Sequence, residues 1–182
     1  MANAREILGR MKSVQDTRKI TNAMYLISST KLKKSKKLLE ETEPYFYTLQ
    51  DLIRRILRHM PEVEHFYFNP RKEIKEEDRV KGLIVITGDK GLAGAYNHNV
   101  LKMAQEWMEQ SKNHRLYVVG ELGRHYFEAR HIQVEEQFHY TVQNPTMHRA
   151  RLISSTILED YEEGRLDEVW IIYTQMLNSM QM

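Results

Sequence analysis

The residues best suited to chemistry are the glycines of one short loop. Gly88, Gly91 and Gly94 follow the apolar residues 82–87 with the spacing G-x-x-G-x-x-G. A strand, a glycine loop and a helix can bind phosphate, because backbone amides and a helix N-terminus attract anions. The dinucleotide fingerprint is G-x-G-x-x-G, however, and the phosphate loop of NTPases needs a Lys-Ser or Lys-Thr pair after its last glycine. Neither pattern is present, so we interpret the three glycines as a tight structural turn and keep a small nucleotide-binding α/β enzyme as the alternative.

Other motifs for catalysis or ligand binding are missing from the sequence. The chain has no cysteine, which excludes a thiol nucleophile and a thiolate zinc site. Its eight histidines are scattered without an H-E-x-x-H spacing, and no G-x-S-x-G elbow is present for a serine nucleophile. The acidic run at 159–163 is typical of a solvated helix face. We therefore predict no catalytic, cofactor-binding or metal-ligating residues, and no cofactor.

Positive charge is concentrated in the first 40 residues. They contain ten lysines and arginines against three acidic residues, whereas the formal net charge of the whole chain is only +2. Five of these lysines fall within residues 31–37. A basic segment on a mildly acidic remainder predicts an acidic partner, which could be a protein, a nucleic acid or a membrane surface. The lysine run lacks the aromatic residues that usually stack on bases, which weakens the nucleic-acid hypothesis.

The same region has the pattern of one long helix with a narrow seam. The seam positions recur at steps of three and four and are Ile7, Met11, Val14, Thr17, Ile20, Met24 and Ile27. A second stripe follows at Phe46, Leu49, Ile53, Ile56, Leu57 and Met60. A basic helix with so narrow a seam needs a partner helix, as in a coiled coil. Pro44 predicts a kink or a break near Glu43, and Pro61 ends the pattern.

The periodicity changes after residue 60. Residues 61–79 are predicted to be a linker, in which the aromatic run 66–68 is expected to pack on the next domain. Strands are then expected at 82–87, 116–119, 132–138 and 169–173, the third of them at an edge, and helices at about 95–110, 122–130 and 145–163. This alternation predicts an α/β fold with Rossmann-like topology. A long N-terminal coiled-coil helix, 1–60, is expected to precede a mostly parallel sheet flanked by helices, 80–182. No run approaches 18 apolar residues, so no membrane-spanning helix is expected.

Three stretches of the sequence resemble one known family. Residues 7–24, with STKL at 29–32 and Pro44-Tyr45, are similar to the N-terminal helix of the gamma subunit of the rotary F-type ATP synthase. The loop GDKGLAGAYN at 88–97 resembles that family's glycine loop, and YEEGRLDE at 161–168 resembles its later helix-to-strand junction. The resemblance extends over essentially all 182 residues. Family members also carry a second long, C-terminal helix that coils against the first, and that helix is absent from this sequence.

The resemblance implies a mechanical function without catalysis by the chain itself. It implies a central-stalk rotor subunit of a proton-translocating F-type ATP synthase, which passes rotation between the membrane c-ring and the catalytic hexamer of alpha and beta subunits. The epsilon subunit is a further implied partner. The implied location is peripheral, on the cytoplasmic face of a bacterial plasma membrane or its organellar equivalent, with membrane association only through the complex and no nucleic acid bound. The residues expected to contact the hexamer are Arg10, Lys12, Arg18, Lys19, Met24, Lys31, Lys33, Lys34, Lys36 and Lys37.

Overall fold

The computed structural model describes residues 4–60, 65, 67, 71, 73–138 and 142–176. Its internal contacts divide the chain into two compact units, Met1–His65 and Phe66–Met182. Much of the predicted linker at 61–79 lies outside the described residues, so the boundaries of the helix, linker and α/β segments stay predictions. Within the predicted aromatic run 66–68, only Tyr67 is described.

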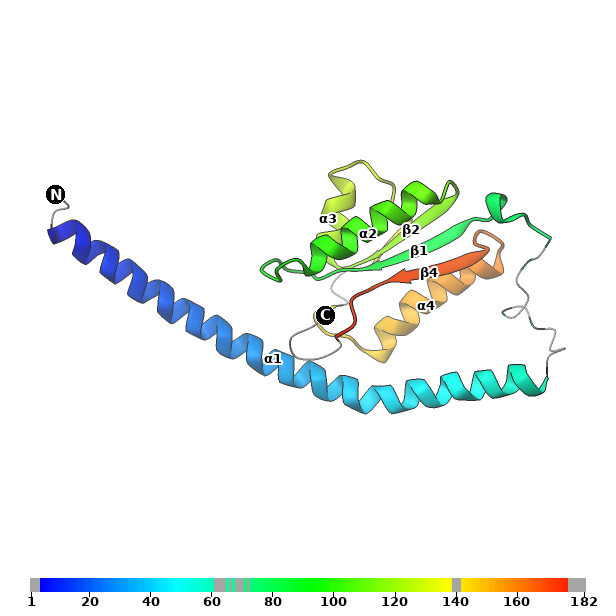
Figure 1. Cartoon of the computed structure of the whole chain (residues 1–182), viewed down its shortest axis with the longest axis horizontal. Coiled ribbons are helices and arrows are strands. Elements are labelled where there is room, and N and C mark those ends of the chain that lie inside the picture. The colour runs from blue at the N-terminus through cyan, green and yellow to red at the C-terminus, as the bar shows by residue number, and fades with distance from the viewer. Residues whose placement is uncertain are drawn as a thin grey trace. The chain divides into compact units, whose positions relative to one another are not determined.

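The first unit is a single helix, α1, which extends from Ala4 to His59 without interruption (Figure 1). Its 56 residues correspond to about 84 Å at about 1.5 Å per residue. Pro44 lies inside this helix and does not break it. The hydroxyls of Thr42 and Thr48 donate to the carbonyl oxygens of Leu38 and Pro44, one turn earlier in each case, at 2.7 Å. Such hydroxyl bonds and a missing proline amide both bend helices, and Figure 1 shows α1 bending where its colour passes from blue to cyan.

The second unit alternates strands and helices, which confirms the predicted α/β fold. Its elements, in chain order, are the short 3₁₀ helix η1 (Glu76–Asp78), β1 (Lys81–Ile86), α2 (Tyr96–Gln110), β2 (His114–Val119), α3 (Glu121–Glu128), β3 (Glu136–Phe138), α4 (Met147–Glu162) and β4 (Glu168–Ile172). The predicted strand and helix positions agree with these bounds to within a few residues. The exception is the third strand, for which the prediction 132–138 is too long.

The sheet has the strand order β3-β2-β1-β4, and every pairing in it is parallel. Leu83 of β1 is opposite Leu116 on one side and Trp170 on the other. The short β3 is an edge strand, as expected, because it pairs only with β2 and only over three positions. Before it, His131 has a φ of 55° in a turn and the amide of Ile132 donates to the carbonyl of Phe127 at 3.0 Å, so the start of the predicted strand belongs to the end of α3.

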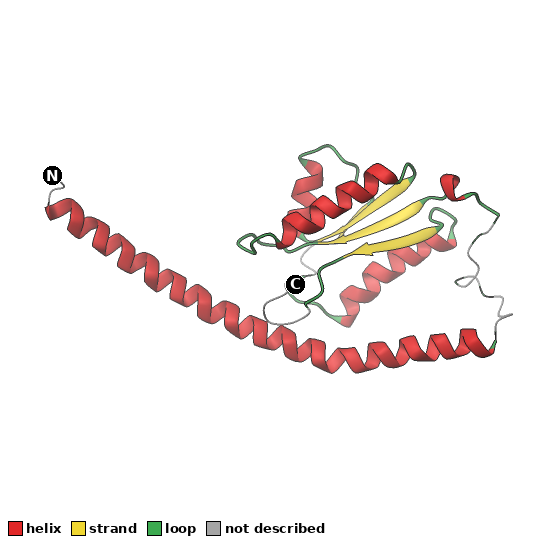
Figure 2. Ribbon diagram, in the orientation of Figure 1, coloured by secondary structure: helices red, strands yellow, loops and turns green. Residues whose placement is uncertain are grey.

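Helices lie on both faces of the sheet and cover its central strands β1 and β2, which explains why these strands are continuous apolar runs (Figure 2). Leu83, Val85, Leu116 and Val118 pack with residues of α2 and α3 on one face. The alternate residues of the same strands pack on the other face with α4, and Tyr117 is completely buried there. The result is a three-layer unit with the helices on the outside (Figure 1).

The ends of α4 follow the signals in the sequence. Thr146 is the residue before the helix, and its hydroxyl accepts from the amide of Arg149 at 3.3 Å. Gly164 follows the helix with a φ of 76°, which favours glycine, and its amide donates to the carbonyl of Tyr161 at 3.2 Å. Gly164 therefore ends the helix, and the chain turns there toward β4.

Candidate functional site

The apolar seam of α1 is open to solvent. No residue of α1 is buried. The exposed fraction of the seam side chains ranges from 47% at Met24 to 68% at Val14, and the second stripe from Phe46 to Met60 is exposed as well. A monomeric protein rarely leaves so long a series of apolar side chains in water. The helix therefore offers a continuous surface for another helix or another protein chain.

The cations of α1 surround this seam. Of the ten residues predicted to contact a partner, all are exposed except Lys36, which is half-buried. Some of these residues pair with acidic neighbours one turn away: Arg10 bonds to Glu6 at 2.8 Å, Lys19 to Asp16 at 3.2 Å and Lys37 to Glu41 at 3.8 Å. Surface pairs of this kind contribute little to stability. The structure thus gathers the predicted residues on one element, while their contact with a partner stays a prediction.

Within residues 31–37, the positive charge is distributed around much of the helix. Lys31 lies four residues after Ile27 and so continues the same face as the seam. Lys33 and Lys34 point to different sides, since successive residues of a helix are about 100° apart. Among the described residues, neither of these two lysines forms an ion pair. An acidic partner would meet these charges without first displacing an internal carboxylate.

The glycine loop after β1 is held in place by side chains of its own unit. The amide of Gly88 donates to Oδ1 of Asn97 at 2.7 Å, and its carbonyl accepts from the amide of Leu122 at 3.1 Å. Gly94 has a φ of 56°, whereas Gly91 has open space around its Cα. The loop is therefore tightly tied at its start and open in its middle. That all three glycines serve the turn stays a prediction.

Asp89 places a carboxylate inside the glycine loop and joins it to two other segments of the unit. Its Oδ1 accepts from the amide of Glu121, at the start of α3, and its Oδ2 accepts from the amide of Gln143, both at 3.1 Å. Backbone amides at a helix N-terminus are the groups that a phosphate would use. Asp89 binds one such amide, at the start of α3, and a carboxylate inside the glycine loop would repel an anion there. This arrangement weighs against the nucleotide-binding alternative.

A pocket of about 510 Å³ lies between α2, the end of the glycine loop that precedes it, and the carboxyl end of β4, the strand next to β1. The strand order reverses between these two strands, and open α/β sheets bind their ligands at such a reversal. Its lining is apolar or neutral, with no lysine or arginine: Ala93, Gly94, Ala95, Tyr96, Asn99, Val100, Met103, Ile172, Tyr173, Thr174 and Gln175. Burial raises the pKa of Tyr96 above its usual value, although the hydrogen bond with Thr174 partly offsets this. The pocket thus lacks the cation that holds outer phosphates.

The acidic run at 159–163 is exposed at Glu159, Glu162 and Glu163, as predicted, but Asp160 is only 8% exposed. Its carboxylate accepts a hydrogen bond from the hydroxyl of Tyr117 and another from Nε of Arg165, the latter at 2.6 Å. Arg115 lies 3.9 Å from the same carboxylate. The expectation was wrong for this residue because Tyr117, on a distant strand, supplies a buried partner that the local sequence cannot reveal. The one local signal that could have suggested the burial of Asp160 is the Gly164-Arg165 pair that follows it, because a turn at the glycine can bring the arginine back to the carboxylate.

These contacts shift the ionisation of both partners. Burial, followed by the hydrogen bond with Asp160, raises the pKa of the Tyr117 hydroxyl well above its usual range. Burial alone would raise the pKa of Asp160 as well, but the hydrogen bonds from Tyr117 and Arg165 outweigh it and lower this pKa. The cluster is a closed structural network, since its polar atoms face one another and no pocket described above opens onto it.

Neither a metal site nor a membrane span is found in the part of the chain that the structure describes. No group of three or more metal-binding side chains comes together among those residues. None of the helices there combines the length and apolarity that a bilayer crossing requires. The exposed helix α1 therefore remains the main candidate for function.

Comparisons with known proteins show which family this chain resembles. The family described as ATP synthase matches residues 3–182. The chain is 44% identical to the ATP synthase gamma chain of Acetivibrio thermocellus over 182 residues, which is 100% of this chain and 61% of the relative. It is 45% identical to that of Ruminiclostridium cellulolyticum, with coverage of 99% and 61%. A relative from Acetobacterium woodii, named "ATP synthase gamma chain, sodium ion specific", is 35% identical, with coverage of 98% and 57%.

These relatives are longer than the chain described here, which spans about three-fifths of their length. The match covers both the basic helix and the α/β unit, so it does not depend on one short motif. The chain therefore belongs to the ATP synthase gamma chain family.

Proposed function

We propose that this chain is a non-catalytic central-stalk subunit that transmits rotation within an F-type ATP synthase. One observation carries the proposal: in a member of the gamma chain family, a helix of 56 residues has no buried residue and exposes both its apolar seam, residues 7–27, and its second stripe, residues 46–60. Burying such a seam against another helix or another chain is favourable, because it removes apolar side chains from water. The chemistry of ATP would take place in the partners.

The proposed mechanism depends on asymmetry. A single shaft inside a ring of alternating alpha and beta subunits contacts the catalytic sites unequally, so their nucleotide affinities differ. Turning the shaft exchanges these contacts and therefore exchanges the affinities, which is coupling through differential contacts. The c-ring and the epsilon subunit are the proposed partners of the α/β unit, and the complex would be peripheral to the membrane on its cytoplasmic face.

The cations of α1 are the proposed contacts with the hexamer. Positive side chains on several sides of one helix can meet acidic groups successively as the helix turns, and Lys33 and Lys34 have no internal carboxylate partner among the described residues. Protons are the proposed coupling ion. The name of the Acetobacterium woodii relative assigns sodium to that protein, so a comparison of both ions belongs in any transport assay.

The experiment replaces both lysines by glutamate, Lys33→Glu with Lys34→Glu, in the reconstituted complex. Ion-driven ATP synthesis should fall, because acidic side chains would repel an acidic partner surface. A matched control reverses two exposed lysines of the second unit, Lys102→Glu with Lys112→Glu, and should keep the parental rate if α1 is the hexamer contact. Synthesis at the parental rate in the α1 double variant would contradict the proposed contact.

A further inference from the structure

A seven-residue repeat extends along the whole of α1 and joins the start of its seam to its second stripe. One row of the repeat has mainly large side chains and consists of Met11, Arg18, Tyr25, Leu32, Leu39, Phe46, Ile53 and Met60. The other row has small residues in its middle and consists of Ile7, Val14, Thr21, Ser28, Ser35, Thr42, Leu49 and Ile56. Rows with this spacing are the a and d positions of a coiled coil and lie on one side of the helix. Because α1 continues through Pro44 without a break, the repeat keeps its register.

The opposite side of α1 carries residues that suit water. The row farthest from the two repeat rows consists of Gly9, Asp16, Ala23, Thr30, Lys37, Pro44, Asp51 and Arg58. This outer row has no large apolar side chain. It also holds Gly9 and Pro44, the two residues of α1 that are least favourable in a helix. The backbone disturbance at Pro44 is therefore turned away from any helix that packs on the two repeat rows.

The two repeat rows are open along their length. Their large apolar side chains are between 39% exposed, at Leu49, and 69% exposed, at Tyr25. The hydroxyls of Thr21 and Thr42 donate to carbonyl oxygens one turn earlier in the helix, at 2.9 Å and 2.7 Å. A helix that covered these threonines would therefore leave neither hydroxyl donor unpaired.

An antiparallel second copy fits these rows because it places large side chains against small ones. In an antiparallel pair of helices, each residue of the large row lies opposite a residue of the small row of the other copy. With the two helices fully overlapped, the layers from the centre outward pair Leu32 with Ser35, Leu39 with Ser28, Phe46 with Thr21 and Ile53 with Val14. Layers of this kind fill the space between two helices without crowding. Arg18, the one charged residue of the two rows, lies opposite Leu49, where its stem can pack while its guanidinium reaches water.

A parallel second copy fits poorly. Each residue would face its own equivalent, so crowded layers of two leucines would alternate with undersized layers of two serines. Lys31 and Lys36 flank the two rows, and they would be neighbours across a parallel interface with like charge. In the antiparallel arrangement, Lys31 lies nearest to Leu38 of the second copy. Lys36 lies nearest to Ser29 of the second copy, so the close lysine pairs disappear.

We propose that the free chain pairs with a second copy of itself through an antiparallel coiled coil of α1. The inference goes beyond the rotor function, because it concerns the chain while no other partner covers this helix. Pairing removes from water the apolar side chains of an element that has no buried residue. Since the hexamer is proposed to use the same helix, the two copies would have to separate before either one binds there.

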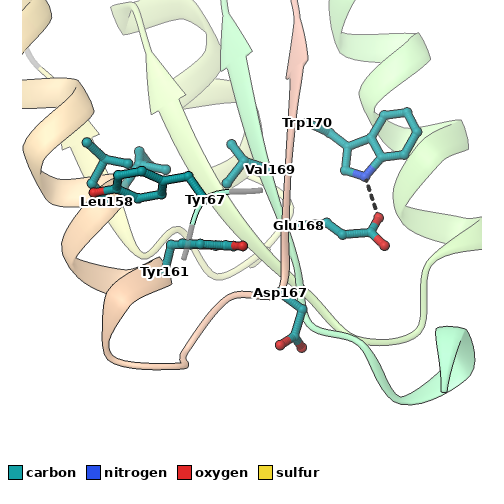
Figure 3. Close-up of a pocket in the computed structure, with 8 residues that line it drawn as sticks. Tyr67, Leu158, Tyr161, Asp167, Glu168, Val169 and Trp170 are labelled. Atoms are coloured by element: carbon teal, nitrogen blue, oxygen red, sulfur yellow. Dashed lines mark hydrogen bonds between the residues drawn. The ribbon is translucent and has the colours of Figure 1, made fainter. Parts of the chain in front are cut away.

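The α/β unit has an apolar surface of its own, which the test must distinguish from α1. Figure 3 shows this groove of about 480 Å³, which lies beside α4 and β4 and whose lining includes Leu158, Tyr161, Val169 and Trp170. Tyr67 of the same unit also lines it, and its ring lies 6.1 Å from that of Tyr161. Val169 is 41% exposed and provides a control position in this groove.

Sedimentation velocity of the purified chain measures the pairing, and a dimer should form as the concentration rises. Leu32→Asp combined with Leu39→Asp should raise the dissociation constant at least about a hundredfold, because the interface would bury carboxylates without partners. Ala23→Asp combined with Thr30→Asp adds the same charge to the outer row of α1 and should leave the dissociation constant near the parental value. Val169→Asp should also leave it unchanged.

Single cysteines test the direction and the register, since the chain has no cysteine of its own. Ser28→Cys and Leu39→Cys should form a disulfide when the two variants are mixed and oxidised with diamide, and neither variant should form one alone. A parallel pair would instead form disulfides in each variant alone. Mixing Ser28→Cys with Leu32→Cys or with Phe46→Cys is the matched control. These pairs would require a shift of one repeat, about 10 Å along the helix, which a disulfide cannot span.

The outcomes separate the possibilities. A dimer that links position 28 to position 39, and that the two aspartates at 32 and 39 abolish, would support the proposal. A monomer at every concentration would overturn it, as would a disulfide in either single variant alone or an association that only Val169→Asp abolishes. The purified chain alone is used, so a chain that dimerises in this way but does not bind the hexamer would contradict the rotor function and leave this inference standing.

Discussion

Replacing Asp160 by alanine should reduce the stability of the α/β unit by about 3 kcal/mol. Its carboxylate, 8% exposed, accepts from Tyr117 and Arg165. A hydrogen bond to a charged group contributes about 1.5–3 kcal/mol when buried. The Tyr117 hydroxyl would stay in the core without this acceptor, so the free energy of unfolding would fall by the full contribution of that hydrogen bond. The Arg165 side chain is 38% exposed, so water would replace part of its hydrogen bond to Asp160. The expected loss for the two hydrogen bonds together is therefore at the lower end of their summed range.

Urea unfolding followed by tryptophan fluorescence measures this loss in the right unit. The chain has two tryptophans, Trp107 and Trp170, and both belong to the α/β unit, where their rings lie 6.1 Å apart. Tyr117→Phe should cost about half as much as Asp160→Ala, because it removes one bond and leaves no unpaired hydroxyl. Asp51→Ala, on the exposed surface of α1, should change nothing in this signal. A loss below about 1 kcal/mol for Asp160→Ala would refute the assignment of this network as a buried support.

Two further predictions concern the same unit. The pKa values of Asp160 and Glu168 are lowered in the folded state, so their stabilising contribution is present above their unfolded pKa values, about 4, and is lost as the pH falls through the folded pKa values. The urea midpoint should therefore drop between pH 5 and pH 3, and Asp160→Asn should make that drop smaller. An unchanged drop in the variant would contradict the role of Asp160. Gly120→Ala should destabilise the unit by about 3 kcal/mol or more, because the φ of Gly120 is 106° and a Cβ there would lie 2.3 Å from the carbonyl oxygen of Thr87. Gly91→Ala is the control and should be near neutral in the same urea assay, since a Cβ at Gly91 would meet open space. Equal urea midpoints for the two variants would argue against the close approach of Gly120 to Thr87.

Much of the fold could be predicted because its signals are local. The seam of α1 repeats at helical spacing, and the buried strands are apolar runs between turn residues, so their positions follow from short stretches of sequence. Pro44 could not be assigned in the same way. A proline removes one backbone hydrogen bond and adds a steric contact, and whether the helix then bends or breaks depends on how the neighbouring turns adjust.

The interior contacts were harder to predict, since they join distant residues. Asp160 looks like part of an acidic surface until Tyr117 is brought next to it by the sheet. In the same way, Arg71 resembles one charge in a solvated run, and only the fold shows that Asp167 binds it. The candidate interaction surface was accessible to sequence reasoning for the opposite reason, because the pattern of a helix without buried residues follows from its own sequence alone.

The central claim is that partner chains bind α1. Size-exclusion chromatography of the chain mixed with alpha and beta subunits tests this claim most directly. The exposed seam and the surrounding cations predict co-elution at one copy of this chain per alpha–beta hexamer, with binding that weakens as salt screens the lysines. Elution of the chain apart from an intact hexamer would contradict the account.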